Sequence, residues 1–296
     1  MSSPRLLAVS DLHVRYPENR AITEGLRPTS DGDWLIVAGD VAEQVADVAW
    51  ALELLRDRFA TVIWVPGNHE LWTRKKDPVA LRGVARYEHL VALCRELGVL
   101  TPEDPFPVWH GDGGPATVAP LFVLYDYTFR PAGTSTYDEA IAAAYAAGVV
   151  ATDEALLAPD PYPGRAEWCH ARVELSAQRL AACDPDIPTV LVNHWPLTRT
   201  PTRVLTYPEF ALWCGTERTA DWHVRYRAKV VVYGHLHIPR VIHEDGVRFV
   251  EASLGYPREW KKRDLRFGTT VTDLLPRQVL PVPPAPDGPP VPGDPR

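Results

Sequence analysis

The stretch that decides the fold is Thr-Val-Ile-Trp-Val-Pro-Gly-Asn-His-Glu, residues 61–70, in which an apolar run passes directly into Gly67, Asn68, His69 and Glu70. A short β-rich apolar run of this kind is typical of a strand that is buried on both faces. An amide and an imidazole placed side by side just past such a strand can serve a metal site and proton transfer from one loop. Alone, this tetrapeptide is weak support for either role.

Four other segments of the chain have the same construction, in which an apolar run ends in a loop that carries Asp, Asn or His. They are residues 6–10 before Asp11-Leu-His13, residues 34–38 before Gly39-Asp40, residues 189–192 before Asn193-His194, and residues 229–233 before Gly234-His-Leu-His237. In open α/β sheets, ligands bind beyond the carboxyl ends of the strands. The recurrence therefore predicts that these polar side chains meet at one edge of the strands.

The chain has 296 residues, 46% hydrophobic and 23% charged, which suits one large α/β domain. Apolar residues at helical spacing in 43–59 and 79–97 alternate with the first strands, as in a layered α/β fold. We expect a single domain over residues 1–275, with a helical insertion or cap at about 126–186. A strand is expected at 121–125, and residues 276–296, rich in proline, are expected to form a flexible tail.

Several classes of protein are disfavoured by composition. The formal net charge of -7 argues against a general nucleic-acid binder. The apolar runs are far shorter than the roughly 20 residues that cross a bilayer, and the first ten residues are interpreted as a strand rather than a signal peptide. The four cysteines are scattered without a CxxC pair, which fits buried thiols in a reduced cytoplasm.

The candidate ligands are too many for one tetrahedral ion and suit two ions of higher coordination number that share a carboxylate. They are Asp11, His13, Asp40, Asn68, His194, His235 and His237. Oxygen and imidazole ligands without thiolate indicate manganese, iron or zinc. Each residue taken singly is more simply a turn or cap residue. The occurrence of five such motifs in one chain favours a shared metal site over five separate turn or cap residues.

These five motifs, in this order, resemble the signatures of calcineurin-like metallophosphoesterases. The resemblance implies a four-layer αββα sandwich and a dinuclear metal centre that hydrolyses phosphoesters. It implies that Asp11, His13, Asp40 and His237 bind one metal, and that Asp40, Asn68, His194 and His235 bind the other. Asp40 would bridge the ions, and His69 would protonate the leaving oxygen. Many members carry an Asp three residues after the bridging residue that orients this histidine; this chain departs from that pattern with Glu43, the candidate to orient His69.

Four further segments resemble the actinobacterial 4′-phosphopantetheinyl hydrolases: residues 64–72, 207–215, 219–222 and 255–260. This resemblance implies a phosphodiesterase that removes 4′-phosphopantetheine from holo acyl carrier protein. From the charge and the short apolar runs, no nucleic-acid or membrane partner is expected. Two alternatives remain at this point. One is a nucleotide or cyclic-nucleotide phosphodiesterase, and the other is a metal-bound scaffold without catalysis.

Basic clusters and tryptophans beside the motifs are candidate substrate-binding residues. Arg74-Lys75-Lys76 follows one motif, and Arg258, Lys261, Lys262, Arg263 and Arg266 follow another, so an acidic carrier protein could be steered there. Trp72, Trp195, Trp213 and Trp260 could line a groove for the pantetheine arm. The alternatives are solvated surface charge for the basic residues and core packing for at least half of the tryptophans.

Overall fold

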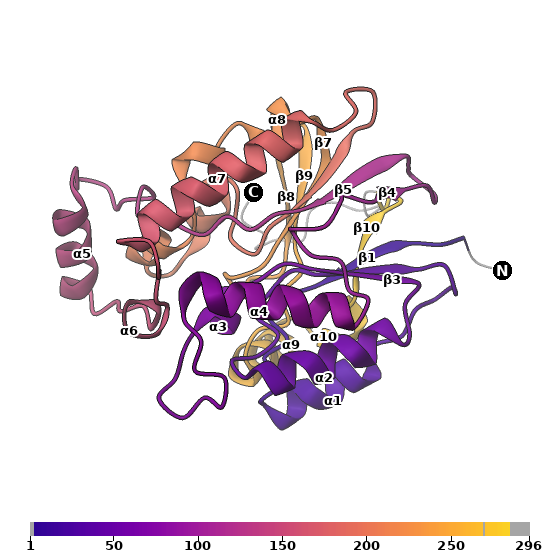
Figure 1. The fold of residues 1–296 in the computed structure, drawn as a ribbon, viewed down its shortest axis with the longest axis horizontal. Coiled ribbons are helices and arrows are strands. Elements are labelled where there is room, and N and C mark those ends of the chain that lie inside the picture. The colour runs from indigo at the N-terminus through magenta and orange to yellow at the C-terminus, as the bar shows by residue number, and fades with distance from the viewer. Residues whose placement is uncertain (1–2, 269, 285–296) are drawn as a thin grey trace.

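The computed structural model describes residues 3–268 and 270–284 and contains two β-sheets packed face to face (Figure 1). The first sheet has the order β10-β1-β2-β3, with β10 (Arg277–Leu280), β1 (Leu6–Val9), β2 (Trp34–Val37) and β3 (Thr61–Trp64). The second has the order β4-β5-β6-β7-β9-β8, with β4 (Val108–Trp109), β5 (Ala116–Pro120), β6 (Thr189–Val192), β7 (Ala228–Tyr233), β9 (Val247–Glu251) and β8 (Val241–Glu244). The ligand-bearing strands β1, β2 and β3 run parallel in one sheet, as β6 and β7 do in the other.

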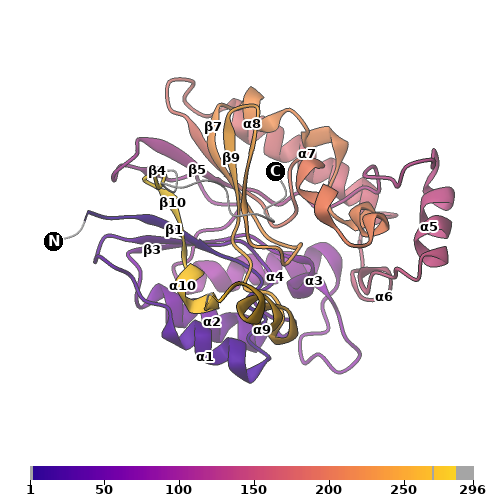
Figure 2. The same ribbon diagram turned by 180° about the vertical axis from the view of Figure 1, so that it is seen from behind.

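Helices cover the outer face of each sheet. On the side of the first sheet lie α1 (Pro17–Gly25), α2 (Val45–Arg56), α3 (Asn68–Leu71), α4 (Gly83–Glu96), α9 (Pro257–Phe267) and α10 (Val271–Leu274) (Figure 2). On the other side lie α7 (Arg165–Ala181) and α8 (Trp222–Arg225), while α5 (Tyr137–Ala146) and α6 (Asp153–Leu156) extend from one end of the molecule. Short 3-10 turns occupy Thr200–Val204, Pro208–Trp213 and Glu217–Thr219. The four-layer αββα prediction is confirmed.

Alternate residues of each strand enter different cores. Leu6 and Ala8 of β1 lie in the core between the sheets, together with Val190 and Val192 of β6. The intervening residues of the same strands lie in the core beneath the helices. Because both faces of the strands are covered, neither set of positions can be polar. This double burial is why the sequence shows continuous apolar runs rather than alternation.

The two sheets join at the carboxyl ends of their strands. The Ser10 amide donates to the Ala252 carbonyl at 2.8 Å, and the Leu254 amide donates to the Ser10 carbonyl at 2.8 Å, so the end of β1 is bonded to the segment after β9. The loops after β1, β2, β3, β6 and β7 therefore open onto one shared edge.

Two expectations about the middle of the chain need correction. The strand expected at 121–125 is wrong, because the paired strand is Ala116–Pro120. The amide and carbonyl of Val123 bond instead to the Asn193 side chain, each at 2.9 Å, which takes them away from any neighbouring strand. The expected insertion also divides in two. Helices α5 and α6 extend from one end of the molecule, whereas the last helix, α7, belongs to the outer layer, where Cys169 Sγ contacts the Leu124 carbonyl at 3.1 Å.

The end of the chain contributes more to the fold than expected. A tail starting at residue 276 is wrong as a boundary, because Arg277–Leu280 pairs antiparallel with β1 as an edge strand of the first sheet. Proline at the flank of an edge strand is tolerated, since that side needs no ladder bond. Residues 285–296 lie outside the described part. Within residues 3–268 and 270–284, none of the helices is long and apolar enough to span a bilayer.

Candidate metal centre and active site

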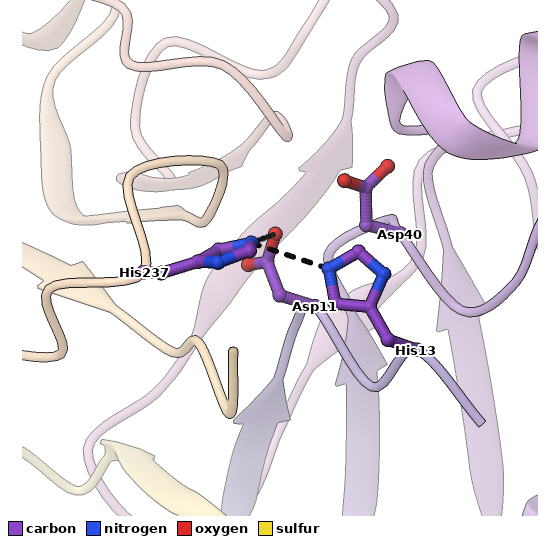
Figure 3. Close-up of side chains that lie close together, drawn as sticks. All are labelled: Asp11, His13, Asp40 and His237. Atoms are coloured by element: carbon purple, nitrogen blue, oxygen red, sulfur yellow. Dashed lines mark hydrogen bonds and ion pairs between the residues drawn. The ribbon is translucent and has the colours of Figure 1, made fainter. Parts of the chain in front are cut away.

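Four of the predicted ligands form a compact group at the edge where the sheets join (Figure 3). Asp11, His13, Asp40 and His237 each offer one ligand atom, and these atoms all lie within 4.8 Å of one another. His237 Nε2 is 3.1 Å from Asp11 Oδ1 and 3.2 Å from His13 Nε2. Loops from both sheets therefore bring together residues that are more than 220 positions apart.

The three other predicted ligands form a second group next to Asp40. Asn68 Oδ1 is 3.3 Å from His194 Nε2 and 3.2 Å from His235 Nδ1. Asp40 Oδ2 is 3.5 Å from His194 Nε2, so this carboxylate faces both groups. The structure thus brings all seven predicted ligands together, with Asp40 between the two sets.

The hydrogen bonds of the histidines leave ring nitrogens free to bind cations. His194 Nδ1 lies 2.8 Å from the Ala38 carbonyl, which can only accept, so Nδ1 carries a proton and Nε2 is the nitrogen that a cation would bind. In the same way His237 Nδ1 donates to Glu259 at 2.7 Å. Burial, with neighbouring histidines, lowers the pKa of both His13 and His235 to about 3, so both rings are neutral at pH 7. Carboxylate, amide and imidazole lone pairs that face one another fit a pair of cations.

The backbone of the site is held in unusual conformations. Eight non-glycine residues in the described part of the chain have positive φ, and five of these are predicted ligands: Asp11 (54°), His13 (43°), Asp40 (55°), His235 (73°) and His237 (57°). Left-handed conformations at non-glycine residues cost free energy and persist where the surroundings impose them. The concentration of such residues at one edge marks it as a functional site.

Glu70 holds the two loops that carry Asp40 and Asn68. Its fully buried carboxylate accepts from the amides of Asp40 (3.0 Å), Val41 (2.6 Å) and Gly67 (2.9 Å). Burial raises the pKa of Glu70 to about 7, and the nearby charge of Asp40 adds to the shift. The sequence pointed to the Gly67–Glu70 stretch but gave Glu70 no role.

His69 faces Asp40 from the other side of the site. Its Nδ1 lies 3.4 Å from Glu43 Oε1 and its Nε2 lies 3.7 Å from Asp40 Oδ2. Burial alone would lower the pKa of His69, but Asp40 and Glu43 outweigh burial and raise it. Glu43 therefore contacts His69, although many family members have the shorter Asp at this position.

Three residues near the ligands were missed as functional residues. Tyr256 places its hydroxyl 3.2 Å from His69 Nε2, Glu259 orients His237, and Asp153 accepts from the Asn68 side-chain amide at 2.9 Å. Tyr256 and Glu259 lie within the 255–260 segment, whose resemblance was a usable signal. Asp153 lies in the expected insertion, and an acidic residue at the start of a helix is too common to indicate a functional role.

The predicted substrate-binding tryptophans are mostly core residues. Trp195 and Trp213 are 0% exposed, so the prediction that they line a groove is wrong, because their rings fill the core beneath the helices. Trp72 is 6% exposed and packs on His69, with ring centroids 3.7 Å apart. Trp260 is half-buried and donates to Asn19 at 2.9 Å.

The basic candidates remain accessible. Arg74 is 3.3 Å from Glu43 Oε1, and it borders a cavity of about 490 Å³ whose lining also includes Lys75 and Arg82. Lys261 and Lys262 are exposed on α9, where Lys261 pairs with Glu18 at 2.8 Å. Both basic clusters are therefore connected to the site, one through Glu43 and the other through the start of α9.

The fold and the two donor groups define a metallophosphoesterase, and the chain belongs to the calcineurin-like phosphoesterase family, whose model matches residues 4–239. It is a metal-dependent phosphoric ester hydrolase of a family that uses a dinuclear metal centre.

One relative is much closer than the family as a whole. Over 262 residues, covering 88% of this chain and 81% of the relative, the chain is 58% identical to the [acyl-carrier-protein] phosphodiesterase PptH of Mycobacterium tuberculosis. The crystal structure of phosphopantetheinyl hydrolase PptH from the same organism superposes with a TM-score of 0.92 at 56% identity, covering 97% of this chain and 99% of that one.

Proposed function

We propose that this enzyme hydrolyses the phosphodiester that links 4′-phosphopantetheine to a serine of holo acyl carrier protein, releasing apo carrier protein and 4′-phosphopantetheine. The observation that carries the proposal is the likeness to PptH, at 58% identity over 88% of this chain. The likeness extends to the whole fold, since the superposition covers 97% of this chain. The four free cysteines support a reducing cytoplasmic location.

The proposed metal ligands are the seven side chains of the two donor groups, six of them buried and His237 partly exposed, and Asp40 would bind both ions. Manganese or iron is the preferred occupant, and zinc also suits oxygen and imidazole ligands. When bound, two such cations stabilise charge on the phosphoryl oxygens and make water a competent nucleophile at neutral pH.

His69 is the proposed proton donor to the leaving serine oxygen. Its Nδ1 is held by Glu43 at 3.4 Å, which leaves Nε2 directed toward Asp40 and the Tyr256 hydroxyl. A protonated His69 would pass its proton to the serine oxygen as the phosphorus–oxygen bond breaks, so that a neutral hydroxyl leaves. General acid catalysis of this kind contributes roughly 10²- to 10⁴-fold in rate.

The carrier protein is the proposed partner of the two basic clusters. Arg74 pairs with Glu43 and borders a cavity together with Lys75, and α9 begins immediately after Tyr256, whose hydroxyl reaches His69. Positive charge around the site of an acidic protein would attract an acidic partner locally. Lys261, Lys262, Arg74 and Trp260 are the proposed contacts.

The test is intact-mass analysis of holo acyl carrier protein incubated with the enzyme and Mn²⁺. The expected product has the mass of the apo protein, because the bond between phosphorus and the serine oxygen breaks. A product that keeps a phosphate would mean cleavage on the pantetheine side, and an unchanged holo mass would refute the proposal. Turnover of nucleotides or cyclic nucleotides but not of carrier protein would favour the alternative phosphodiesterase, and failure to cut even a diaryl phosphodiester with both metals loaded would indicate a scaffold.

A further inference from the structure

The amide of Asn68 is oriented by a residue from a distant part of the chain. Asp153, at the first position of α6, accepts from Asn68 Nδ2 at 2.9 Å and is only 3% exposed. This bond fixes which end of the amide faces the site, because a carboxylate oxygen accepts from NH₂ and would repel the carbonyl oxygen. Asn68 Oδ1 is thereby left toward His194 and His235, at 3.3 and 3.2 Å.

The same oxygen of Asp153 also holds the side chain that packs on His69. Trp72 Nε1 donates to Asp153 Oδ1 at 2.7 Å. The Trp72 ring then lies against His69, with centroids 3.7 Å apart and an interplanar angle of 33°. One buried carboxylate thus contacts both a proposed metal ligand and the neighbour of the proposed acid.

The four-residue helix α6 could not hold Asp153 by itself, since so short a helix has little stability of its own. Arg165 fixes it with all of its guanidinium nitrogens. Its Nε donates to the Leu157 carbonyl at 2.9 Å, and its Nη1 donates to Glu154 Oε2 at 2.9 Å. Its Nη2 donates to the carbonyls of Asp153 (2.7 Å) and Glu154 (2.9 Å).

Glu154 ties this helix to the rest of the molecule. Its Oε1 accepts from the Tyr127 hydroxyl at 2.9 Å and from Trp213 Nε1 at 2.8 Å. Charge-assisted hydrogen bonds of this kind, here partly buried, are stronger than those between neutral groups. The segment around α6 is therefore a rigid support for Asp153 rather than a loose cover.

We infer that Asp153 is a positioning residue for the second metal site, through which the segment around α6 completes the catalytic centre. The inference rests on the proposed role of Asn68 as a ligand. Partners that orient metal ligands typically change metal affinity by about 10- to 100-fold when they are removed. The first donor group draws on other partners, Glu259 and Ser253, so its metal should remain bound.

The test compares Asp153→Ala with Asp153→Asn, which keeps a carbonyl oxygen able to accept both bonds. Metal analysis of the full chain titrated with Mn²⁺ should give two ions for the wild type. For Asp153→Ala it should give one tightly bound ion, with the affinity for the second reduced at least about 10-fold. Asp153→Asn should restore two ions. The exposed helix-start acid of α5 supplies a matched control, Asp138→Ala, which should bind like the wild type.

The retained first ion also shows that Asp153→Ala is folded. Two tightly bound ions in Asp153→Ala would overturn the inference, as would an Asp153→Asn variant as defective as Asp153→Ala. Loss of both ions would overturn it too, since Asp153 would then act on the whole fold. Trp72→Phe, which keeps the Asn68 bond, should still bind two ions. If wild-type enzyme leaves holo carrier protein intact but these titrations behave as expected, the proposed substrate fails and the inference stands.

Discussion

At the scale of single residues, Asp40 and His69 are neighbours whose proposed roles differ. Asp40 faces both donor groups, and it also accepts from the His69 amide at 2.9 Å. Despite burial, His194 and His69 hold the pKa of Asp40 well below its usual range, so this carboxyl is ionised at neutral pH. His69, in contrast, has its ring nitrogens engaged by Glu43 and Tyr256, outside the ligand set.

This difference predicts opposite outcomes for two substitutions. Asp40→Ala should lose binding of two metals, because the carboxylate proposed to bind both ions is removed. His69→Asn should keep both ions and lower kcat by roughly 10²- to 10⁴-fold, since only general acid catalysis is lost. Metal analysis and steady-state kinetics on the same preparations check both expectations. If His69→Asn emptied the site, His69 would be a ligand and its assignment as the acid would be wrong.

Glu70 is a residue whose loss should be felt in stability. Its carboxylate accepts three backbone N–H groups from two loops, and Glu70→Ala would leave these buried donors without a partner. Each unsatisfied buried donor costs about 1–3 kcal/mol, offset partly by removal of a buried carboxyl, so we expect a loss of about 3 kcal/mol in the free energy of unfolding. Urea denaturation of the metal-free protein measures it, and an unchanged midpoint would contradict the role.

The ligands could be predicted from the sequence, whereas the residues that orient them could not. Each ligand lies in the segment that directly follows a strand, so local sequence was enough to find Asp11 or His194. Asp153 and Tyr256 act across 85 and 187 positions, on Asn68 and His69. A contact of that kind depends on how loops fold back in space, and no local pattern reports it.

At the scale of elements, the loop after β3 is shaped by a close approach to the loop after β2. A Cβ atom on Gly67 would lie 2.1 Å from Asp40 Oδ1 and 2.6 Å from the Asp40 amide nitrogen. Real side chains do not approach so closely, and the second contact is with backbone that cannot move freely. Glycine is thus required here by the site rather than by the turn itself.

Gly67→Ala should therefore displace Asp40 and lower affinity for both metals, with a loss of stability of about 1–3 kcal/mol from the overpacked contact. Gly25→Ala is the matched control, because a Cβ there meets nothing within 4 Å and the position lies at the end of α1. Thermal unfolding with and without Mn²⁺ compares the two. Equal behaviour of the two variants would mean that the loops tolerate the methyl group.

The elements themselves were predictable to the extent that burial imposed a pattern. The strands carrying ligands were found because both faces are covered and their runs are uniformly apolar. β8 and β9 form an antiparallel hairpin around Asp245-Gly246, a dipeptide favoured in such turns. β10 was missed because its four residues, Arg277–Leu280, lie between prolines and take their strand conformation from pairing with β1. Its strand conformation therefore depends on hydrogen bonding to β1, which the local sequence does not report.

At the scale of the whole molecule, the distribution of charge matters more than its sum. The net charge is -7, which alone would repel an acidic protein. Yet α9 presents exposed Arg258, Lys261, Lys262 and Arg266 immediately beyond Tyr256, and Arg74, which pairs with Glu43, borders a cavity together with Lys75. Screening limits each charge to about 10 Å at moderate salt, so an approaching partner responds to this local surface.

Charge reversal on α9 tests this arrangement. Lys261→Glu/Lys262→Glu should raise KM for holo carrier protein about 10-fold at low salt, by slowing association, while KM for a small diester changes much less. Lys261 pairs with the exposed Glu18 and lies 5.4 Å from the Trp260 ring centroid, and such surface interactions are worth little, so folding should be preserved. The control is Lys229→Glu/Arg56→Glu, which reverses two exposed charges at the ends of β7 and α2 away from the site. Because screening removes a purely electrostatic attraction, the difference between wild type and the α9 variant should shrink as salt rises. A difference that persisted at high salt, or one that the control variant shared, would show that α9 does not steer the carrier protein by its charge.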